Sequence, residues 1–329
     1  MSTDGVSAVV NPPASGPPLR LATRRSTLAR TQSQLVADVL TARCGRRVEL
    51  VEVSTYGDTS RAALASIGGT GVFVSALREA LLAGTADFAV HSLKDLPTTP
   101  PDGLVLAAVP VREDARDALV ARDGLTLGEL PAGSRVGTGS PRRTAQLRAL
   151  GLALDVVDVR GNVETRLGLV SQRAVDAVVL ARAGLARLGR LDAVTEVLDP
   201  IQMLPAPGQG ALAVECRTPE GRASPDAELL MLLAGLDHPP SRATVAAERG
   251  LLSALEAGCS APVGALADVV EGEAGPELYL RAVVARIDGS ADYRLSAYGA
   301  LEDAEGVGRR LATAMLDEGV GDLMGEHIP

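Results

Sequence analysis

The fold class of this chain is decided by the stretch Asp87-Phe88-Ala89-Val90-His91-Ser92-Leu93-Lys94-Asp95-Leu96-Pro97. Phe88 to Val90 is a short apolar run typical of a buried strand, and Pro97 prevents an ordinary continuation of that strand. Between Val90 and Pro97 the chain contains the hydroxyl of Ser92, the cation of Lys94 and the carboxylate of Asp95. Ligands of open α/β sheets bind outside the carboxyl ends of the strands, so this pattern indicates a functional site. A Lys-Asp pair on its own more often marks a solvated loop, and the rest of the chain decides between the two interpretations.

Strand-like and helical segments alternate on both sides of this stretch. Strands are predicted at 19–23, 48–54, 87–91, 104–109, 135–137, 155–159, 176–181 and 211–215. Helices are predicted from Ser26 to about Ala42, through Leu82, from Ser140-Pro141, from about Val163 and after Ala181. This βαβ rhythm predicts largely parallel sheets. The Pro- and Gly-rich segment Leu204 to Gly210 is expected to cross between two domains.

The two ends of the chain follow other patterns. Beyond residue 230, helices are predicted at 243–255 and 307–318, with alternating strands at 278–286 and 293–298. These elements predict a small α+β domain with antiparallel strands. Residues 1–18 are rich in proline and are expected to form a disordered extension.

The composition excludes several classes of function. The chain has 329 residues, 46% of them hydrophobic, which predicts two or three domains. A net charge of -9 disfavours nonspecific nucleic-acid binding, and with 2% aromatic residues base-stacking platforms are nearly absent. Three dispersed cysteines without CxxC spacing argue against a disulfide framework or a zinc site, so no metal is expected. Neither a membrane-length apolar run nor a signal-peptide pattern is found, so a cytoplasmic protein is expected.

Basic side chains gather where predicted strands end and helices begin. They are Arg24, Arg25, Arg142, Arg143, Arg160, Arg166 and Arg187. A cation near a helix N-terminus opposes the helix dipole by about 0.3–1 kcal/mol, a cost that an anionic ligand offsets. Any single arginine is as easily explained by a surface ion pair. Repetition at four strand ends instead predicts a polyanion-binding cleft between two α/β domains. A Walker lysine motif is missing, so a nucleoside triphosphate is not expected there.

Cys259 lies in a loop of small residues, between Gly258 and Ser260. Such a loop is predicted to expose the sulfur, whereas structural cysteines usually lie in strands or helices. No Cys-His dyad can be argued, and the residues alone favour an inert loop cysteine. Cys44, near a helix end, and Cys216, at a strand end, are expected to have no chemical role.

Taken together, these motifs resemble the hydroxymethylbilane synthase family, also called porphobilinogen deaminase, over about residues 19 to 325. The matching runs are Leu21-Ala22-Thr23-Arg24 with Ser26, Gly68-Gly69 with Gly71 and Phe73-Val74, His91-Ser92-Leu93-Lys94-Asp95-Leu96-Pro97, Gly137-Thr138 with Ser140 and Arg142-Arg143, Arg160-Gly161-Asn162-Val163 with Thr165-Arg166-Leu167, Gly208-Gln209-Gly210-Ala211, and Gly258-Cys259 with Pro262. Their order and spacing along the chain make the resemblance specific.

The resemblance implies an enzyme of tetrapyrrole, and hence heme and porphyrin, biosynthesis. Such an enzyme joins four porphobilinogen molecules head to tail on a covalently bound dipyrromethane cofactor, releases ammonia, and then frees hydroxymethylbilane by hydrolysis. It implies Asp95 as the catalytic carboxylate and Cys259 as the thioether attachment point. The implied cofactor-binding residues are Ser92, Lys94, Asp95, Ser140, Arg142, Arg143 and Arg160. The implied substrate-binding residues are Arg24, Arg25, Ser26, Phe73, Arg160, Arg166, Arg187 and Gln209.

The resemblance also implies a domain organisation. Two type II periplasmic-binding-protein-like α/β domains are expected to flank the cleft, followed by a small α+β domain that attaches the cofactor. The expected boundaries are 19–110 with 211–230 for domain 1, 111–210 for domain 2 and 231–329 for domain 3. The protein is expected to be a monomer that binds neither nucleic acid nor membranes.

Two points qualify the match. Arginines around Asp95 would favour its ionised form, so this carboxylate is expected to act as an anion that stabilises a cation rather than as a general acid. The chain also departs from the family pattern at Arg25, Thr70 and Gly139, where Gln, Lys and Ser are frequent. These departures concern contacts around the cleft rather than the chemistry.

Two other functions remain open from the residues. A non-enzymatic small-anion-binding protein of the same architecture would explain the arginines, but not Cys259 or Asp95. A phosphoryl-transfer enzyme would need a phosphate loop and a metal-binding carboxylate cluster, which the sequence lacks.

Overall fold

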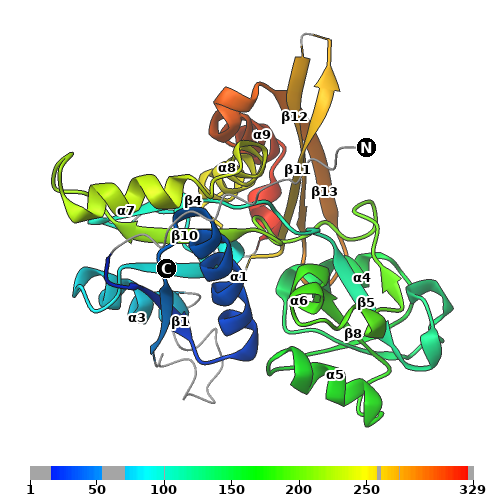
Figure 1. The fold of residues 1–329 in the computed structure, drawn as a ribbon. Coiled ribbons are helices and arrows are strands. Elements are labelled where there is room, and N and C mark those ends of the chain that lie inside the picture. The colour runs from blue at the N-terminus through cyan, green and yellow to red at the C-terminus, as the bar shows by residue number, and fades with distance from the viewer. Residues whose placement is uncertain (1–15, 54–70, 100, 258–260, 274, 325–329) are drawn as a thin grey trace, which may run out of the picture.

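The computed structural model describes residues 16–53, 71–99, 101–257, 261–273 and 275–324. They form three lobes, each built on one sheet (Figure 1). Lobes A and B are α/β and lie side by side, and lobe C, with an antiparallel sheet, lies across them. This arrangement confirms the predicted fold class; the exact domain boundaries stay a prediction.

Sheet A has five strands in the order β2-β1-β3-β10-β4. Their bounds are β1 Leu19–Arg24, β2 Val48–Val53, β3 Phe88–Ser92, β4 Leu104–Ala108 and β10 Leu212–Arg217. The helices of lobe A are α1 Thr27–Cys44, α3 Gly71–Leu82 and α7 Pro225–Ala234. Ser26 caps α1 by accepting a hydrogen bond from the Ala29 amide, and Gly45 ends the helix in the left-handed conformation.

Sheet B repeats this order with five other strands, β7-β6-β8-β5-β9. Their bounds are β5 Asp117–Ala121, β6 Arg135–Gly137, β7 Asp155–Val157, β8 Ala177–Ala181 and β9 Glu196–Val197. The helices of lobe B are α4 Pro141–Ala149, α5 Val163–Ser171 and α6 Arg182–Arg187. Ser140 caps α4 and Pro141 occupies its first turn, as the sequence predicts.

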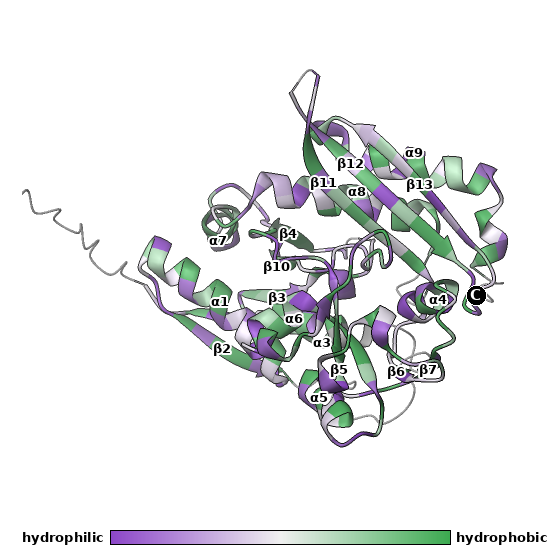
Figure 2. Cartoon of the chain, turned by 90° about the vertical axis from the view of Figure 1, so that its right-hand side faces the viewer, coloured by the Kyte–Doolittle hydropathy of each residue, from purple (hydrophilic) through white to green (hydrophobic). Residues whose placement is uncertain are grey.

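Lobe C contains the antiparallel strands β11 Val263–Gly272, β12 Gly275–Ala285 and β13 Asp292–Gly299. Helices α8 Pro239–Ala254 and α9 Ala304–Asp317 pack on one face of this sheet. Figure 2 shows hydrophobic and hydrophilic residues alternating along these strands, which is the period-2 pattern of a sheet covered on one face.

The prediction of largely parallel sheets is wrong for half of the strand pairs. In sheet A, β10 runs antiparallel to both β3 and β4, and in sheet B, β5 runs antiparallel to both β8 and β9. Both strands directly follow a crossing from the other lobe, so each enters its sheet from the side opposite to the βαβ strands. Strands β5, β9 and β11 and helix α7 were not expected from the sequence.

Two crossing segments, residues 109–116 and 204–211, connect lobes A and B. They lie side by side, because Arg112 Nε donates to Gln209 O at 2.8 Å. Glu248 of α8 is fully buried and accepts from both segments, at 2.7 Å from Arg112 Nη1 and at 2.6 Å from the Gly208 amide. It also accepts from the Ala267 amide of β11 at 2.9 Å. One carboxylate of lobe C therefore holds both crossings.

Candidate active site

The stretch that decides the fold ends in a tight turn at the carboxyl end of β3. Leu93 to Asp95 forms a 3₁₀ turn in which Leu93 is buried, whereas Lys94 and Asp95 are half-buried. The Leu93 amide donates to Ala211 O at 3.0 Å, which ties the turn to the second crossing. Ser92 Oγ accepts from Gln32 Nε2 of α1 at 3.0 Å. The turn is thus fixed on both sides.

Lys94 extends from this turn toward the second crossing. Its Nζ donates to Gln209 Oε1 at 3.3 Å. Burial lowers the pKa of Lys94 to about 8; the carboxylate of Asp95 opposes this shift, and the charge of Arg143 adds to it. Lys94 is therefore a cation that can lose its proton in mildly alkaline solution.

A fully buried carboxylate, Asp117, organises the other side of the site. Arg142 Nη2 lies 2.9 Å from Asp117 Oδ2, and Arg143 Nη2 lies 2.7 Å from Oδ1. Gln209 Nε2 also donates to Oδ1, at 2.8 Å. Burial acts to raise the pKa of Asp117, but both guanidinium charges and these hydrogen bonds outweigh it and hold the pKa far below its usual range. Asp117, Arg142, Arg143, Gln209 and Lys94 form what we call the Asp117 cluster.

Arg142 and Arg143, which are predicted to bind the cofactor, are paired with Asp117, and their role in binding stays a prediction. Arg142 and Arg143 are only 4% and 5% exposed; Arg142 also donates to Leu204 O of the second crossing, and Arg143 to Val179 O of β8. Burial lowers the pKa of Arg142. Its Nε is buried without a hydrogen-bond partner among the described residues. The cluster therefore keeps an unused donor and more cations than Asp117 alone balances.

Two further predicted arginines lie at the edge of the cluster. Arg166 is half-buried and donates through Nε to Gly161 O at 2.9 Å; burial and the charge of Arg143 lower its pKa. Arg187 donates to Gly210 O at 2.6 Å, and burial lowers its pKa too. Arg166 therefore places a partly desolvated cation near the start of α5, and Arg187 places one at the second crossing. An anion would be stabilised at either position.

The other predicted site residues are more exposed, end a strand, cap helices, or lie outside the described residues. Arg160 is 53% exposed and contacts Asp158 at 3.1 Å, and Arg25 is 65% exposed with Glu52 at 4.0 Å. Arg24 ends β1 and is half-buried, while Ser26 and Ser140 serve as helix caps. Cys259 lies outside the described residues, as does the side chain of Phe73.

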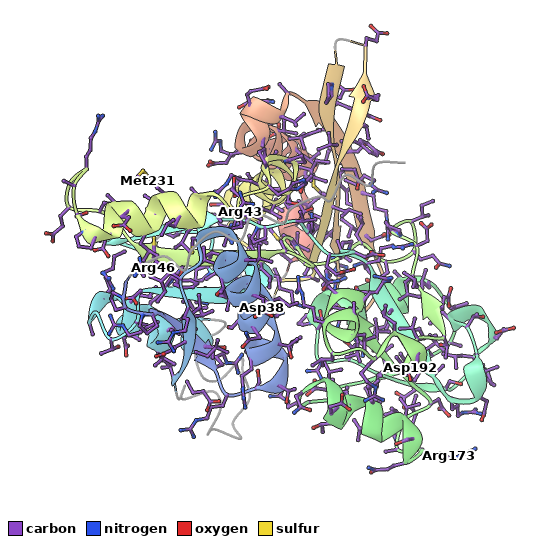
Figure 3. All side chains as sticks on the ribbon, in the orientation of Figure 1. Asp38, Arg43, Arg46, Arg173, Asp192 and Met231 are labelled. Atoms are coloured by element: carbon purple, nitrogen blue, oxygen red, sulfur yellow. The ribbon has the colours of Figure 1, made fainter. Side chains whose placement is uncertain are left out.

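Other arginines lie away from this site. Figure 3 places Arg173 at the outer end of lobe B, and Arg43 and Arg46 near α7. Arg173 faces Asp123 at 3.8 Å and Arg46 faces Glu228 at 3.7 Å, which are surface pairs of little energetic weight. The gathering of buried cations around Asp117 is therefore a local feature.

Sequence reasoning missed Asp117 and Gln32. Asp117 carries a detectable signal, because it is an acid at the head of the apolar run Ala118 to Ala121. Gln32 has no comparable signal within its helix. Of the other two cysteines, Cys216 is buried, which raises the pKa of its thiol to about 11, and Cys44 is half-buried at the end of α1; that neither has a chemical role stays a prediction.

Two classes of site find no support in the described part of the chain. No group of three or more His, Cys, Asp or Glu side chains there could hold a metal ion. Among the same residues, no helix combines the length and apolar character needed to cross a membrane.

Lys94 at a strand end of lobe A and the buried arginine pair of lobe B are linked through Gln209 and Asp117, in a protein built on two connected α/β lobes. Residues 19–224 match the family described as porphobilinogen deaminase, dipyromethane cofactor binding domain, and residues 242–317 match the porphobilinogen deaminase C-terminal domain. The chain belongs to the porphobilinogen deaminase family.

Curated relatives are similar over nearly their full length. The chain is 59% identical over 323 residues to porphobilinogen deaminase 1 of Streptomyces avermitilis, covering 94% of this chain and 98% of that one. It is 56% identical over 311 residues to porphobilinogen deaminase of Mycobacterium tuberculosis, covering 93% and 98%.

Solved structures with a similar arrangement include a periplasmic substrate-binding protein of an ABC transporter from Coxiella burnetii, with a TM-score of 0.42 and 14% identity, covering 70% of this chain and 96% of that one. Another is the periplasmic aliphatic sulphonate binding protein SsuA of Escherichia coli, with a TM-score of 0.36 and 16% identity, covering 74% and 71%.

Proposed function

We propose that this protein is a cytoplasmic, monomeric hydroxymethylbilane synthase that condenses four porphobilinogen molecules head to tail on a dipyrromethane primer. Each condensation releases ammonia, and hydrolysis finally releases hydroxymethylbilane for tetrapyrrole biosynthesis. The observation that carries the proposal is the turn bearing Asp95 beside the Asp117 cluster, in a chain of the porphobilinogen deaminase family.

The residues of the site fit a dipyrromethane group. This group carries four carboxylates, and the described site offers Lys94, Arg142 and Arg143 against Asp95 and Asp117. The unpartnered Nε of Arg142 provides a buried donor for such a carboxylate. When bound, the dipyrromethane supplies the nucleophilic pyrrole carbon to which the first unit is joined, and each later unit is joined to the end of the growing chain. Cys259 would hold it covalently, and Ser92, Lys94, Ser140, Arg142, Arg143 and Arg160 would orient it.

Asp95 would act on the incoming substrate as an anion. The aminomethyl group reacts in its protonated form: its C–N bond breaks, the nitrogen takes the bonding electrons and leaves as neutral ammonia, and the positive charge passes to a cation delocalised over the pyrrole. A fixed carboxylate beside the pyrrole stabilises that developing cation more than it stabilises the ammonium group of the bound substrate, which is the condition for catalysis. Arg24, Arg25, Ser26, Phe73, Arg160, Arg166, Arg187 and Gln209 would bind the substrate or the growing chain.

The test of this proposal is an intact mass of the purified protein. Wild type should exceed the mass of its sequence by one covalent dipyrrole, and Cys259→Ser should show the sequence mass, remain folded and lose activity, because a serine oxygen is a far weaker nucleophile than a thiolate. Cys44→Ser is the matched control and should keep the added mass.

Two outcomes contradict the proposal. An added mass that persists in Cys259→Ser would move the attachment to another residue. A wild-type protein without added mass, and without ammonia release from porphobilinogen, would favour the non-enzymatic anion-binding protein instead.

A further inference from the structure

Asp117 and Gln209 occupy the two points at which the chain passes between lobes A and B. Asp117 is the first residue of β5, immediately after the first crossing, and Gln209 lies within the second crossing. In the register of sheet B, Asp117 pairs with Ala181, the last residue of β8. Its carboxylate is therefore level with the carboxyl end of a central strand, where α/β sheets bind their ligands.

The Gln209 side chain has only one orientation that satisfies its neighbours. Its Nε2 donates to Ala115 O at 2.7 Å and to Asp117 Oδ1 at 2.8 Å, and both of these atoms can only accept. The amide oxygen is consequently left to face Lys94 Nζ, a group that can only donate when charged. Asp117 and the Ala115 carbonyl together determine which atom of Gln209 is presented to Lys94.

The same carboxylate contacts the arginine pair directly. Arg142 forms an ion pair with Oδ2, and Oδ1 accepts hydrogen bonds from both Arg143 and Gln209. Lys94 belongs to lobe A, both arginines belong to lobe B, and Gln209 belongs to the connection between the lobes. A single buried group therefore connects all three parts of the site.

We propose that Asp117 is a positioning residue: through Gln209 it places Lys94 beside Asp95, and it holds Arg142 and Arg143 directly, so that the reacting and anion-binding halves of the site keep one geometry. This inference rests on the proposed function. Neither Asp117 nor Gln209 needs to touch the reacting atoms for this role.

The role has a consequence for the pH dependence of activity. Among the described residues, the charges that act on the pKa of Lys94 come from Asp95 of its own turn, Asp117 of β5, and Arg142 and Arg143 of α4. Asp95 and Asp117 favour the charged amine, and both arginines disfavour it. Because Lys94 serves the bound carboxylates as a cation, kcat/KM should fall as the pH rises through about 8. Loss of the Asp117 charge should move this fall to lower pH.

The experiment compares Asp117→Asn with Glu215→Gln. Glu215 is also a buried carboxylate on an antiparallel return strand, but its partners are Arg78 and His91, and it does not contact the Asp117 cluster. Both substitutions are nearly isosteric. The measurements are kcat and KM for porphobilinogen between pH 6 and 10 as an approximate range, the thermal midpoint, and the intact mass of each variant.

Asp117→Asn should lower kcat and shift the alkaline pKa of kcat/KM downward by about one unit. Glu215→Gln should lower the thermal midpoint and keep the wild-type alkaline limb. If Asp117→Asn does not fold, Gln209→Met decides instead, because it removes the acceptor of Lys94 and leaves every charge in place. It should shift the alkaline limb in the same direction by a smaller amount.

The inference is overturned if the folded variant keeps the wild-type alkaline limb, or if Glu215→Gln shifts that limb equally. A wild-type profile without an alkaline fall near pH 8 overturns it as well. These outcomes differ from failure of the proposed function, in which the wild-type protein itself would carry no dipyrrole and release no ammonia.

Discussion

Lobes A and B have the same strand order, and each places one buried carboxylate on its antiparallel return strand. In lobe A this is Glu215 of β10, and in lobe B it is Asp117 of β5. Glu215 pairs with Ala89, near the start of β3, whereas Asp117 pairs with the last residue of β8. At about 3.3 Å per residue, Glu215 lies on the order of 10 Å below the carboxyl end of its neighbouring strand. The register, not the topology, decides which carboxylate meets the site.

The partners of the two carboxylates follow from this difference. Glu215 accepts from Arg78 of α3 at 2.8 Å and lies 3.2 Å from His91 Nε2, so both partners belong to its own lobe. Asp117 combines partners from lobe B with Gln209 of the crossing. One carboxylate stabilises the interior of a lobe, and the other connects the two lobes.

The largest effect is expected from Glu215→Ala. Breaking a buried ion pair leaves an uncompensated charge, here on Arg78, and costs about 3–5 kcal/mol of unfolding free energy. Denaturant unfolding at pH 7 measures this loss, while kcat of the protein that remains folded should match wild type. A large drop in kcat without loss of stability would place Glu215 in the site and break the comparison.

The same residue has an expected acid signature. Burial acts to raise the pKa of Glu215, but His91 and Arg78 outweigh it and hold the pKa at about 2, against a usual 4.5. Its stabilising contribution is present above about pH 4.5 and is lost as the pH falls toward 2. Glu215→Gln should therefore flatten the dependence of unfolding free energy on pH in this window.

A second prediction concerns Asp95, on the turn that ends β3. Asp95→Asn removes the charge that would stabilise the cation and should lower single-turnover ammonia release by a factor of about a hundred or more. Asp95→Glu keeps the charge and should retain more activity. Both variants must first be shown by mass to carry the cofactor. If Asn outperforms Glu, charge is not what this residue contributes.

The smallest effects separate two arginines of lobe B. Arg160→Leu should weaken substrate binding or elongation by about 1–2 kcal/mol, because Arg160 is exposed, and should leave stability unchanged. Arg142→Leu should lower both binding and stability, because it also removes a buried partner of Asp117.

Arg309→Leu is the control for this pair. Arg309 forms an exposed ion pair with Glu305 within α9, far from the strand ends in the sequence, and its loss should change neither property by more than about 0.5 kcal/mol. Equal behaviour of all three variants would contradict the anion-binding assignment.

The sequence predicts those features that depend on local signals. The strand that ends before Lys94-Asp95, the Ser140-Pro141 helix start and the crossing around Gly208-Gln209-Gly210 all carry such signals. The last of these requires glycine, since a Cβ at Gly210, where φ is +86°, would lie 2.3 Å from Glu113 O.

The missed features depend on contacts between distant segments. The direction of β5 depends on the path of the chain, which reaches this strand from the other lobe. A short stretch of sequence carries no signal for that path. The sequence likewise shows that Arg142 and Arg143 stand together near a helix start. It does not show that Asp117, 25 residues before Arg142, forms an ion pair with each of them. The sequence therefore predicts the arginines of the cluster but not the buried carboxylate that pairs with them.

The insertion of β10 between β3 and β4 also sets an order of assembly. Every strand of sheet B precedes Leu212 in the chain, so a growing polypeptide can complete lobe B while lobe A still lacks a central strand. Until then β3 and β4 expose unpaired edges, which are sites for mispairing. The segment that finally closes sheet A is preceded directly by Gln209. Completion of the first lobe and delivery of the amide that faces Lys94 are therefore one and the same folding event.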